Sequence, residues 1–69
     1  MEENDVFEER RNHITPKGGV YSIAIYYEKE TFRPCLKSKA GVIVISEYDE
    51  NDICLARTYG YMKNRVNGD

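Results

Sequence analysis

Residues 41–61 decide the fold, and they read Gly-Val-Ile-Val-Ile-Ser-Glu-Tyr-Asp-Glu-Asn-Asp-Ile-Cys-Leu-Ala-Arg-Thr-Tyr-Gly-Tyr. Two runs rich in Val, Ile and Tyr flank a polar cluster at residues 49–52. Branched and aromatic side chains favour strands, whereas Asp and Asn favour turns. The stretch therefore predicts a β-hairpin.

The turn of this hairpin has two candidate geometries. A three-residue loop with Asp52 in the left-handed conformation pairs Asp49 with Ile53 and Glu47 with Leu55, which places the odd-numbered residues of both strands on one face. A two-residue loop shifts the pairing and mixes the faces. We expect the three-residue loop, although Gly or Asn more often occupies a left-handed position.

The hairpin also resembles one hairpin of the tyrosine-aspartate repeats found in large bacterial shell and toxin proteins. The residues that carry the resemblance are Tyr48-Asp49, the polar turn, Leu55 and Thr58-Tyr59-Gly60. The chain departs from the repeat at Asp52, where a Gly is expected, and has the hairpin once, whereas repeat architectures depend on stacked copies. The resemblance implies the turn geometry and no function.

A further strand is expected at residues 19–28, where apolar residues occupy both alternating positions. The connection at residues 29–40 is too short for a helical crossover, so the strands run antiparallel. We predict a mainly β fold, a small three-stranded antiparallel meander with strands near 19–28, 41–48 and 53–62. The expected apolar layer consists of odd-numbered residues, namely Tyr21, Ile23, Ile25, Tyr27, Ile43, Ile45, Leu55 and Tyr59.

The ends of the chain differ from this central domain at residues 15–62. Residues 1–14 begin acidic and turn basic at Arg10 and Arg11, an order of charge that a helix dipole favours. We expect either a short helical turn or a disordered tail there, because so short a helix is marginal alone. Residues 63–69 are polar and predict a flexible tail.

Composition limits the size of the core and the class of protein. The chain has 69 residues, 41% hydrophobic and 32% charged, which is enough for one domain with a thin core. The net charge of −2 argues against a general binder of nucleic acid or membrane surfaces. No apolar run reaches the roughly 18 residues of a membrane span, and the N-terminus does not have the pattern of a signal peptide. We expect a cytoplasmic protein.

The residues that usually carry chemistry are few and scattered. Cys35 and Cys54 are expected to be free thiols, Cys35 exposed in a loop and Cys54 packed in a strand. His13 has no neighbouring carboxylate or nucleophile in the sequence, and one His with two distant Cys does not predict a zinc site. We expect a non-enzymatic protein with no metal and no cofactor.

The second face of the predicted sheet, formed by even-numbered residues, gives the main functional hypothesis. This face is also largely apolar, through Val20, Ala24, Tyr26, Val42, Val44 and Cys54. A sheet that is apolar on both faces must be covered on both. We expect a protein-protein interaction module that self-associates through a sheet face or edge, as a homodimer, or that binds another protein. The candidate partner-binding residues are Tyr26, Tyr48, Val42, Val44, Lys29, Arg33, Lys37 and Lys39.

The alternative hypothesis is binding of single-stranded nucleic acid. Tyrosine side chains on a sheet are a typical platform for stacked bases, and the loop at residues 29–39 is basic. The side chains expected to share this face are Tyr21, Tyr27, Tyr59 and Tyr61, with Arg57 among them.

Overall fold

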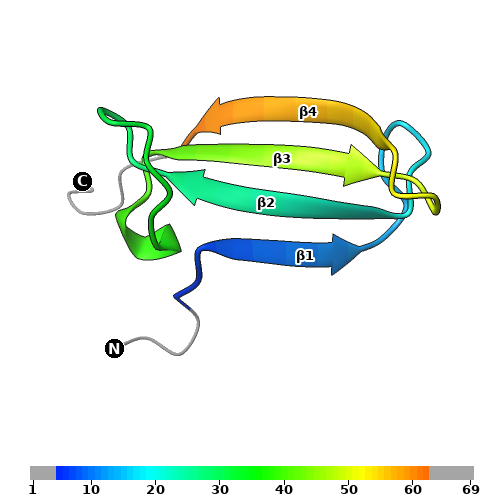
Figure 1. Ribbon diagram of the computed structural model, residues 1–69, viewed down its shortest axis with the longest axis horizontal. Coiled ribbons are helices and arrows are strands. Elements are labelled where there is room, and N and C mark those ends of the chain that lie inside the picture. Colours follow the sequence, from blue (N-terminus) through cyan, green and yellow to red (C-terminus); the bar gives the residue numbers. More distant parts are fainter. Residues whose placement is uncertain (1–4, 63–69) are drawn as a thin grey trace.

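The computed structural model describes residues 5–62, which form a four-stranded antiparallel sheet with strand order β1-β2-β3-β4 (Figure 1). The mainly β antiparallel meander is as predicted, but the sheet has four strands and not three. The strands are β1 (Glu8–Asn12), β2 (Tyr21–Tyr27), β3 (Val42–Tyr48) and β4 (Cys54–Tyr61), and the 3-10 helix η1 spans Lys37–Lys39.

β1 forms in the segment for which the sequence predicts a helical turn or a disordered tail. It pairs with β2, with Glu8 opposite Ile25 and Asn12 opposite Tyr21. A run of four charged residues has low strand propensity, so local sequence gives no signal for this strand. The unpaired edge of β2 supplies the hydrogen bonds that override this propensity. The tail predicted at residues 63–69 lies outside the described residues.

The pairing register defines the two faces of the sheet. Ile25 of β2 lies opposite Val44 of β3, which in turn lies opposite Tyr59 of β4. Paired residues point to the same side, so odd-numbered residues of β2 and β4 share a face with even-numbered residues of β3. The expected layer of odd-numbered residues is therefore wrong for β3, and Ile43 and Ile45 lie on the face opposite Ile25.

The turn between β3 and β4 has the expected three-residue form. Asp52 has a φ of 65°, in the left-handed region. The Asp49 N–H donates to the Ile53 C=O at 3.1 Å, which closes the loop. Asp is among the few residues with a Cβ that adopt the left-handed conformation, and the Asp52 carboxylate is held there by the Tyr21 hydroxyl at 2.7 Å.

A β-bulge just after this turn moves the hairpin out of the expected register. Glu47 lies opposite Ala56 and not opposite Leu55, because β4 has one extra residue at the bulge. The β2–β3 pairing also joins odd to even positions. Each of the two pairings is shifted by one residue from the expected one. The odd-numbered residues of β2 and β4 therefore still share a face, as expected, and only the residues of β3 lie on the faces opposite to those predicted.

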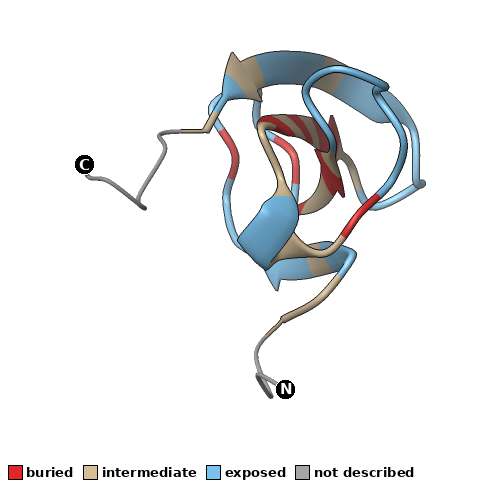
Figure 2. Cartoon of the chain, turned by 90° about the vertical axis from the view of Figure 1, so that its left-hand side faces the viewer, coloured by how far each residue is buried: buried red, intermediate tan, exposed pale blue. Residues whose placement is uncertain are grey.

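Buried positions lie mainly on the two inner strands, while β1 and β4 are largely exposed (Figure 2). No large side chain of residues 5–62 is completely buried, which agrees with the thin core expected from the length. The buried hydrophobic residues are Tyr21, Tyr26, Cys35, Val42 and Val44.

The two cysteines are free, but their burial is the reverse of the prediction. Cys35 is buried because its N–H donates to the Tyr26 C=O at 3.0 Å, which holds the loop against the end of β2. Cys54 begins the outer strand at the bulge and is exposed. Burial raises the pKa of the Cys35 thiol and so disfavours its reactive thiolate.

Candidate functional site

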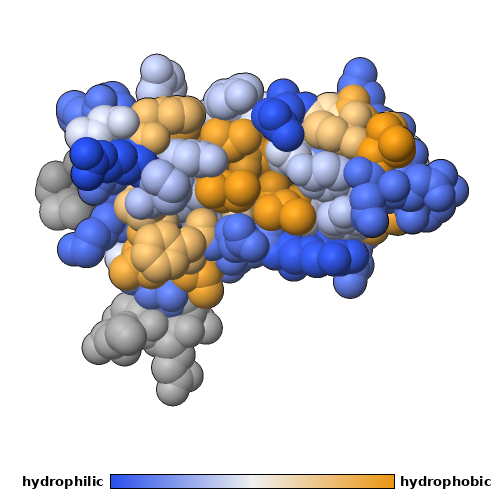
Figure 3. Space-filling model, viewed as in Figure 1, coloured by the Kyte–Doolittle hydropathy of each residue, from blue (hydrophilic) through white to orange (hydrophobic). Residues whose placement is uncertain are grey.

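The register places five of the six tyrosines on one face of the sheet, here called the tyrosine face. The prediction that Tyr21, Tyr27, Tyr59 and Tyr61 share a face with Arg57 is confirmed, and Tyr48 joins them. On the side of the molecule seen in Figure 1, apolar side chains gather over the middle of the sheet (Figure 3).

The tyrosine face is packed at its inner strands and open at its outer strand. Tyr21 stacks on Tyr48 with ring centroids 5.1 Å apart, and the Arg10 guanidinium lies 4.0 Å from the Tyr21 ring centre. Tyr59 and Tyr61 of β4 are 62% and 80% exposed. Among the strands, the exposed aromatic rings of this face are therefore on β4, and Phe32 of the loop that follows β2, stacked on Tyr27, adds a ring that is 50% exposed.

Tyr59 and Tyr61 also lie on the free backbone edge of β4. The Met62 N–H donates to the Gly41 C=O, so every second residue of β4 directs its backbone toward β3. The intervening residues Arg57, Tyr59 and Tyr61 direct their N–H and C=O groups away from the sheet. This edge is eight residues long and has a single charged side chain, Arg57.

The free edge of β1 has a different chemistry. The Tyr26 N–H donates to the Phe7 C=O, and the same alternation leaves the backbone groups of Glu8, Arg10 and Asn12 facing outward. Two of these three residues are charged, and β1 has five residues only. Short, charged edge strands are the usual protection against strand pairing between chains, and β4 lacks this protection.

The basic residues of the predicted partner-binding set do not form one patch. The Lys29 ammonium lies 5.7 Å from the Tyr61 ring centre, on the tyrosine face. Gly41 permits this position, because a Cβ added there would lie 2.7 Å from the Lys29 Cβ. Lys37 turns to the opposite face and pairs with Glu9 at 3.5 Å. Arg33 and Lys39 are exposed in the loop.

The apolar residues of the predicted set are mostly inside the protein. Val42, Val44 and Tyr26 are 6%, 7% and 2% exposed, so they offer little surface to a partner. Tyr48 is half-buried under its stack with Tyr21. The predicted partner-binding set leaves out the exposed Tyr59 and Tyr61, which only the nucleic-acid alternative named, because it placed the exposed apolar surface on the even-numbered face.

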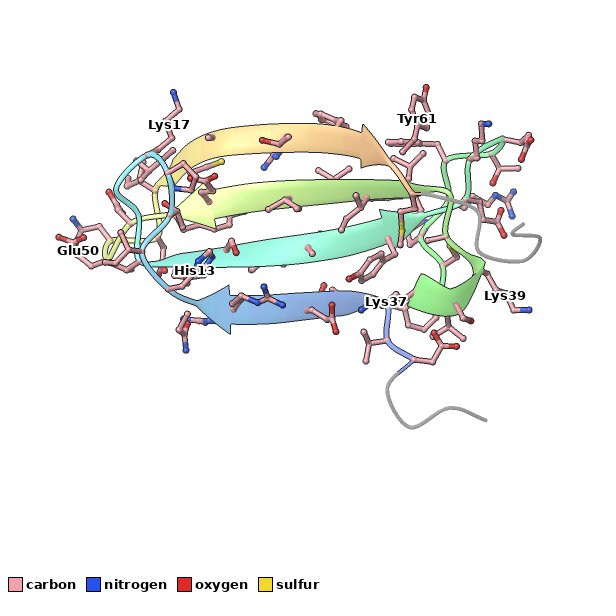
Figure 4. The ribbon with its side chains drawn as sticks, turned by 180° about the vertical axis from the view of Figure 1, so that it is seen from behind. His13, Lys17, Lys37, Lys39, Glu50 and Tyr61 are labelled. Atoms are coloured by element: carbon pink, nitrogen blue, oxygen red, sulfur yellow. The ribbon has the colours of Figure 1, made fainter. Side chains whose placement is uncertain are left out.

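The other face of the sheet, here called the groove face, is hollowed along Ala24, Ile43 and Ile45 into an open groove of about 480 Å³. The groove runs along the strands from the region of His13 to that of Lys37, which lie toward opposite ends of the sheet in Figure 4. Its floor is apolar and its ends are polar, the usual composition of a ligand-binding site.

The Lys37 end of the groove is closed by hydrogen bonds. The Tyr26 hydroxyl donates to the Glu9 carboxylate at 2.6 Å, and Lys37 approaches the same carboxylate oxygen at 3.5 Å. Burial is the main cause that raises the pKa of Tyr26 to about 12, and the hydrogen bond to Glu9 is the second cause. The bond from Tyr26, reinforced by Lys37, lowers the pKa of Glu9.

His13 has a neighbour that the sequence does not reveal. Its Nε2 lies 3.0 Å from the Ser22 Oγ, because the β1–β2 pairing brings the two together, and the expectation of no nearby nucleophile is wrong. No hydrogen bond within residues 5–62 reaches the other ring nitrogen. The third group that orients a histidine base in serine hydrolases is thus missing from the described part of the chain.

Residues 5–62 contain no cluster of three or more His, Cys, Asp or Glu side chains arranged to hold a metal ion. Within the same residues, no helix has the length and apolar character needed to cross a membrane. No protein-family model, curated protein or solved structure matches the chain, so its function is inferred from its own residues.

Proposed function

We propose that the protein is a non-enzymatic protein-protein interaction module that self-associates by pairing β4 with β4 of a second copy. The observation that carries this proposal is the difference between the two sheet edges. β1 is short and charged, whereas β4 is long and presents Tyr59 and Tyr61 beside unpaired backbone groups. An unprotected edge of this kind is a template for another strand.

A two-fold arrangement suits the residues of this edge. Two copies of β4 related by a two-fold axis pair antiparallel and extend the sheet from four strands to eight. In registers centred on Thr58 or Tyr59, Arg57 lies opposite Tyr59 or Tyr61 of the second copy. Each Arg57 then faces an aromatic ring, a cation-π arrangement that contributes about 0.5–1 kcal/mol at an exposed site.

Two substitutions at Tyr59 test the edge separately from the side chain. Tyr59→Pro removes an outward N–H that β3 does not use, whereas Tyr59→Ala removes the ring and keeps the N–H. We expect the wild type to be dimeric at high micromolar concentration by sedimentation equilibrium. Tyr59→Ala should weaken the dimer by about tenfold, and Tyr59→Pro should abolish it.

Glu8→Pro is the matched control, because the Glu8 N–H faces outward on the β1 edge and its side chain is exposed. This variant should remain a dimer. The proposal fails if the wild type is monomeric at every concentration, or if Tyr59→Pro and Glu8→Pro dimerise equally well. Amide NMR spectra of both variants verify that each keeps the sheet.

Single-stranded nucleic acid is the second candidate partner. It is supported by the exposed rings of Tyr59 and Tyr61 on the same face as Arg57, with Lys29 close to Tyr61. If this candidate is correct, labelled oligonucleotides should bind at about 50 mM salt, with an affinity that falls steeply as salt increases. Tyr59→Ala combined with Tyr61→Ala should remove the binding. We rank it second, because the net charge is −2 and the basic loop residues are divided between the faces.

A further inference from the structure

The groove face has a feature that the proposed self-association does not use. The groove contains two carboxylates, Glu9 near Lys37 and Glu47 near His13, and their surroundings differ. Glu9 accepts the Tyr26 hydroxyl and pairs with Lys37. Its charge is therefore balanced within the protein by Lys37, and its side chain is 42% exposed.

Glu47 is more deeply buried than Glu9 and has fewer partners. It is 9% exposed, and its one hydrogen bond within residues 5–62 is a long one of 3.4 Å from the Lys17 N–H. No cation of the described chain lies within ion-pair distance of it, although Arg11 lines the same groove. A carboxylate buried to this extent is normally paired, because removing its charge from water is costly. Glu47 is therefore the group in the groove with unused capacity for a cation.

We propose that the groove binds a small aliphatic primary ammonium ion, with the ammonium group at Glu47 and the alkyl chain along Ile45 and Ile43. The volume of about 480 Å³ is within the range of small-molecule sites. The apolar floor takes the chain, and the carboxylate takes a charge-assisted hydrogen bond. An anion would be repelled by Glu47 at one end of the groove, and Lys37 at the other end is already paired with Glu9.

The opposite end of the groove determines which amine fits. Lys37 stands there and is only partly neutralised by Glu9, at 3.5 Å. A second positive charge at the far end of the ligand would meet this ammonium group. The groove therefore prefers a monoamine to a diamine of the same length.

Three ligands of equal chain length test the inference on the wild-type protein, namely hexylamine, hexanoate and 1,6-diaminohexane. Amide chemical shifts in NMR titrations report both the affinity and the location. We expect hexylamine to bind with a dissociation constant in the millimolar range, as its small size implies. The shifts should centre on Ala24, Ile43, Ile45 and Glu47, and the diamine and hexanoate should bind at least several-fold more weakly.

Glu47→Gln and Glu50→Gln form a matched pair of variants, since Glu50 is an exposed carboxylate in the turn. Glu47→Gln should weaken hexylamine binding by about tenfold or more, the loss expected for a charge-assisted bond. Glu50→Gln should leave it unchanged. Equal binding by Glu47→Gln, equal binding of hexanoate by the wild type, or shifts confined to the tyrosine face would each overturn the inference. Hexylamine that produces no shift would overturn it as well.

Discussion

Tyr26 illustrates how one side chain joins several parts of the structure. Its ring is 2% exposed on the groove face, its hydroxyl donates to Glu9 of β1, and its C=O accepts the Cys35 N–H. Tyr26 therefore holds β1 and the loop that contains Cys35 against β2. The high β-propensity of Tyr26 was evident in the sequence. Its hydrogen-bond partners were not, because Glu9 lies 17 residues before it and Cys35 nine residues after it.

The raised pKa of Tyr26 predicts a loss of stability at high pH. The folded-state pKa is about 12, against 10.0 ordinarily, so the stabilisation is complete below pH 10 and is lost as the pH rises through 12. Tyr26→Phe should therefore flatten the pH dependence of the free energy of unfolding over this range. A residual slope will remain, because the bond to Asp52 raises the pKa of Tyr21 as well.

Urea unfolding at neutral pH and at several alkaline pH values measures this effect. At neutral pH, Tyr26→Phe should cost about 1 kcal/mol for the lost hydrogen bond. Tyr59→Phe is the control, because that ring is 62% exposed, and its pH profile should match the wild type. Parallel profiles for Tyr26→Phe and the wild type would contradict the prediction.

At the scale of the element, the β3–β4 turn combines local and long-range interactions. Asp52 occupies the left-handed conformation, which is unfavourable for a residue with a Cβ. Its carboxylate accepts the Tyr21 hydroxyl at 2.7 Å, which joins the turn to the start of β2. The side chain thus stabilises the fold through Tyr21 while its backbone conformation costs free energy.

A double-mutant cycle separates these two effects. In a Tyr21→Phe background, Asp52→Gly should stabilise the protein by about 0.5 kcal/mol, because Gly adopts a positive φ without steric cost. In the wild-type background the same substitution should be neutral or destabilising, since it also removes the hydrogen bond. Thermal or urea unfolding of the four proteins gives the coupling. Identical effects of Asp52→Gly in both backgrounds would show that the Tyr21 bond contributes nothing.

At the scale of the whole molecule, residues 5–62 provide little that covers the sheet. Five hydrophobic residues in this range are buried, and large apolar side chains such as Ile53, Leu55 and Tyr59 are exposed. A domain of this size is marginal without a second stabilising interaction. The proposed self-association through β4 would supply one, because any partner that binds only the folded state stabilises it.

The melting temperature should therefore depend on protein concentration. Raising the concentration by a hundredfold should increase the midpoint by about 5 °C in the wild type, because dimerisation is linked to folding. Tyr59→Pro should melt at a temperature that does not change with concentration. Circular dichroism in cells of different path length makes this measurement, and a concentration-independent midpoint in the wild type would argue against a dimer.

Local chemistry in the sequence determined the fold class, the hairpin and its turn. Alternation of Tyr and Ile predicted β2, and the polar cluster around Asp52 predicted the left-handed loop residue. These features depend on neighbours in the chain, so the sequence contains them. The grouping of Tyr21, Tyr27, Tyr59 and Tyr61 was also predicted, but only because two register displacements cancel.

The tertiary structure alone decided the strand β1, the inversion of β3 and the surroundings of Glu47. The charged residues of β1 form a strand because β2 offers unpaired backbone groups, a condition that no local pattern records. A bulge of one residue at Leu55 exchanges the faces of the hairpin, since side chains alternate with a period of two. Burial of Glu47 follows from the β2–β3 pairing, and the contact of His13 with Ser22 follows from the β1–β2 pairing, because these pairings join segments that are separate in the chain.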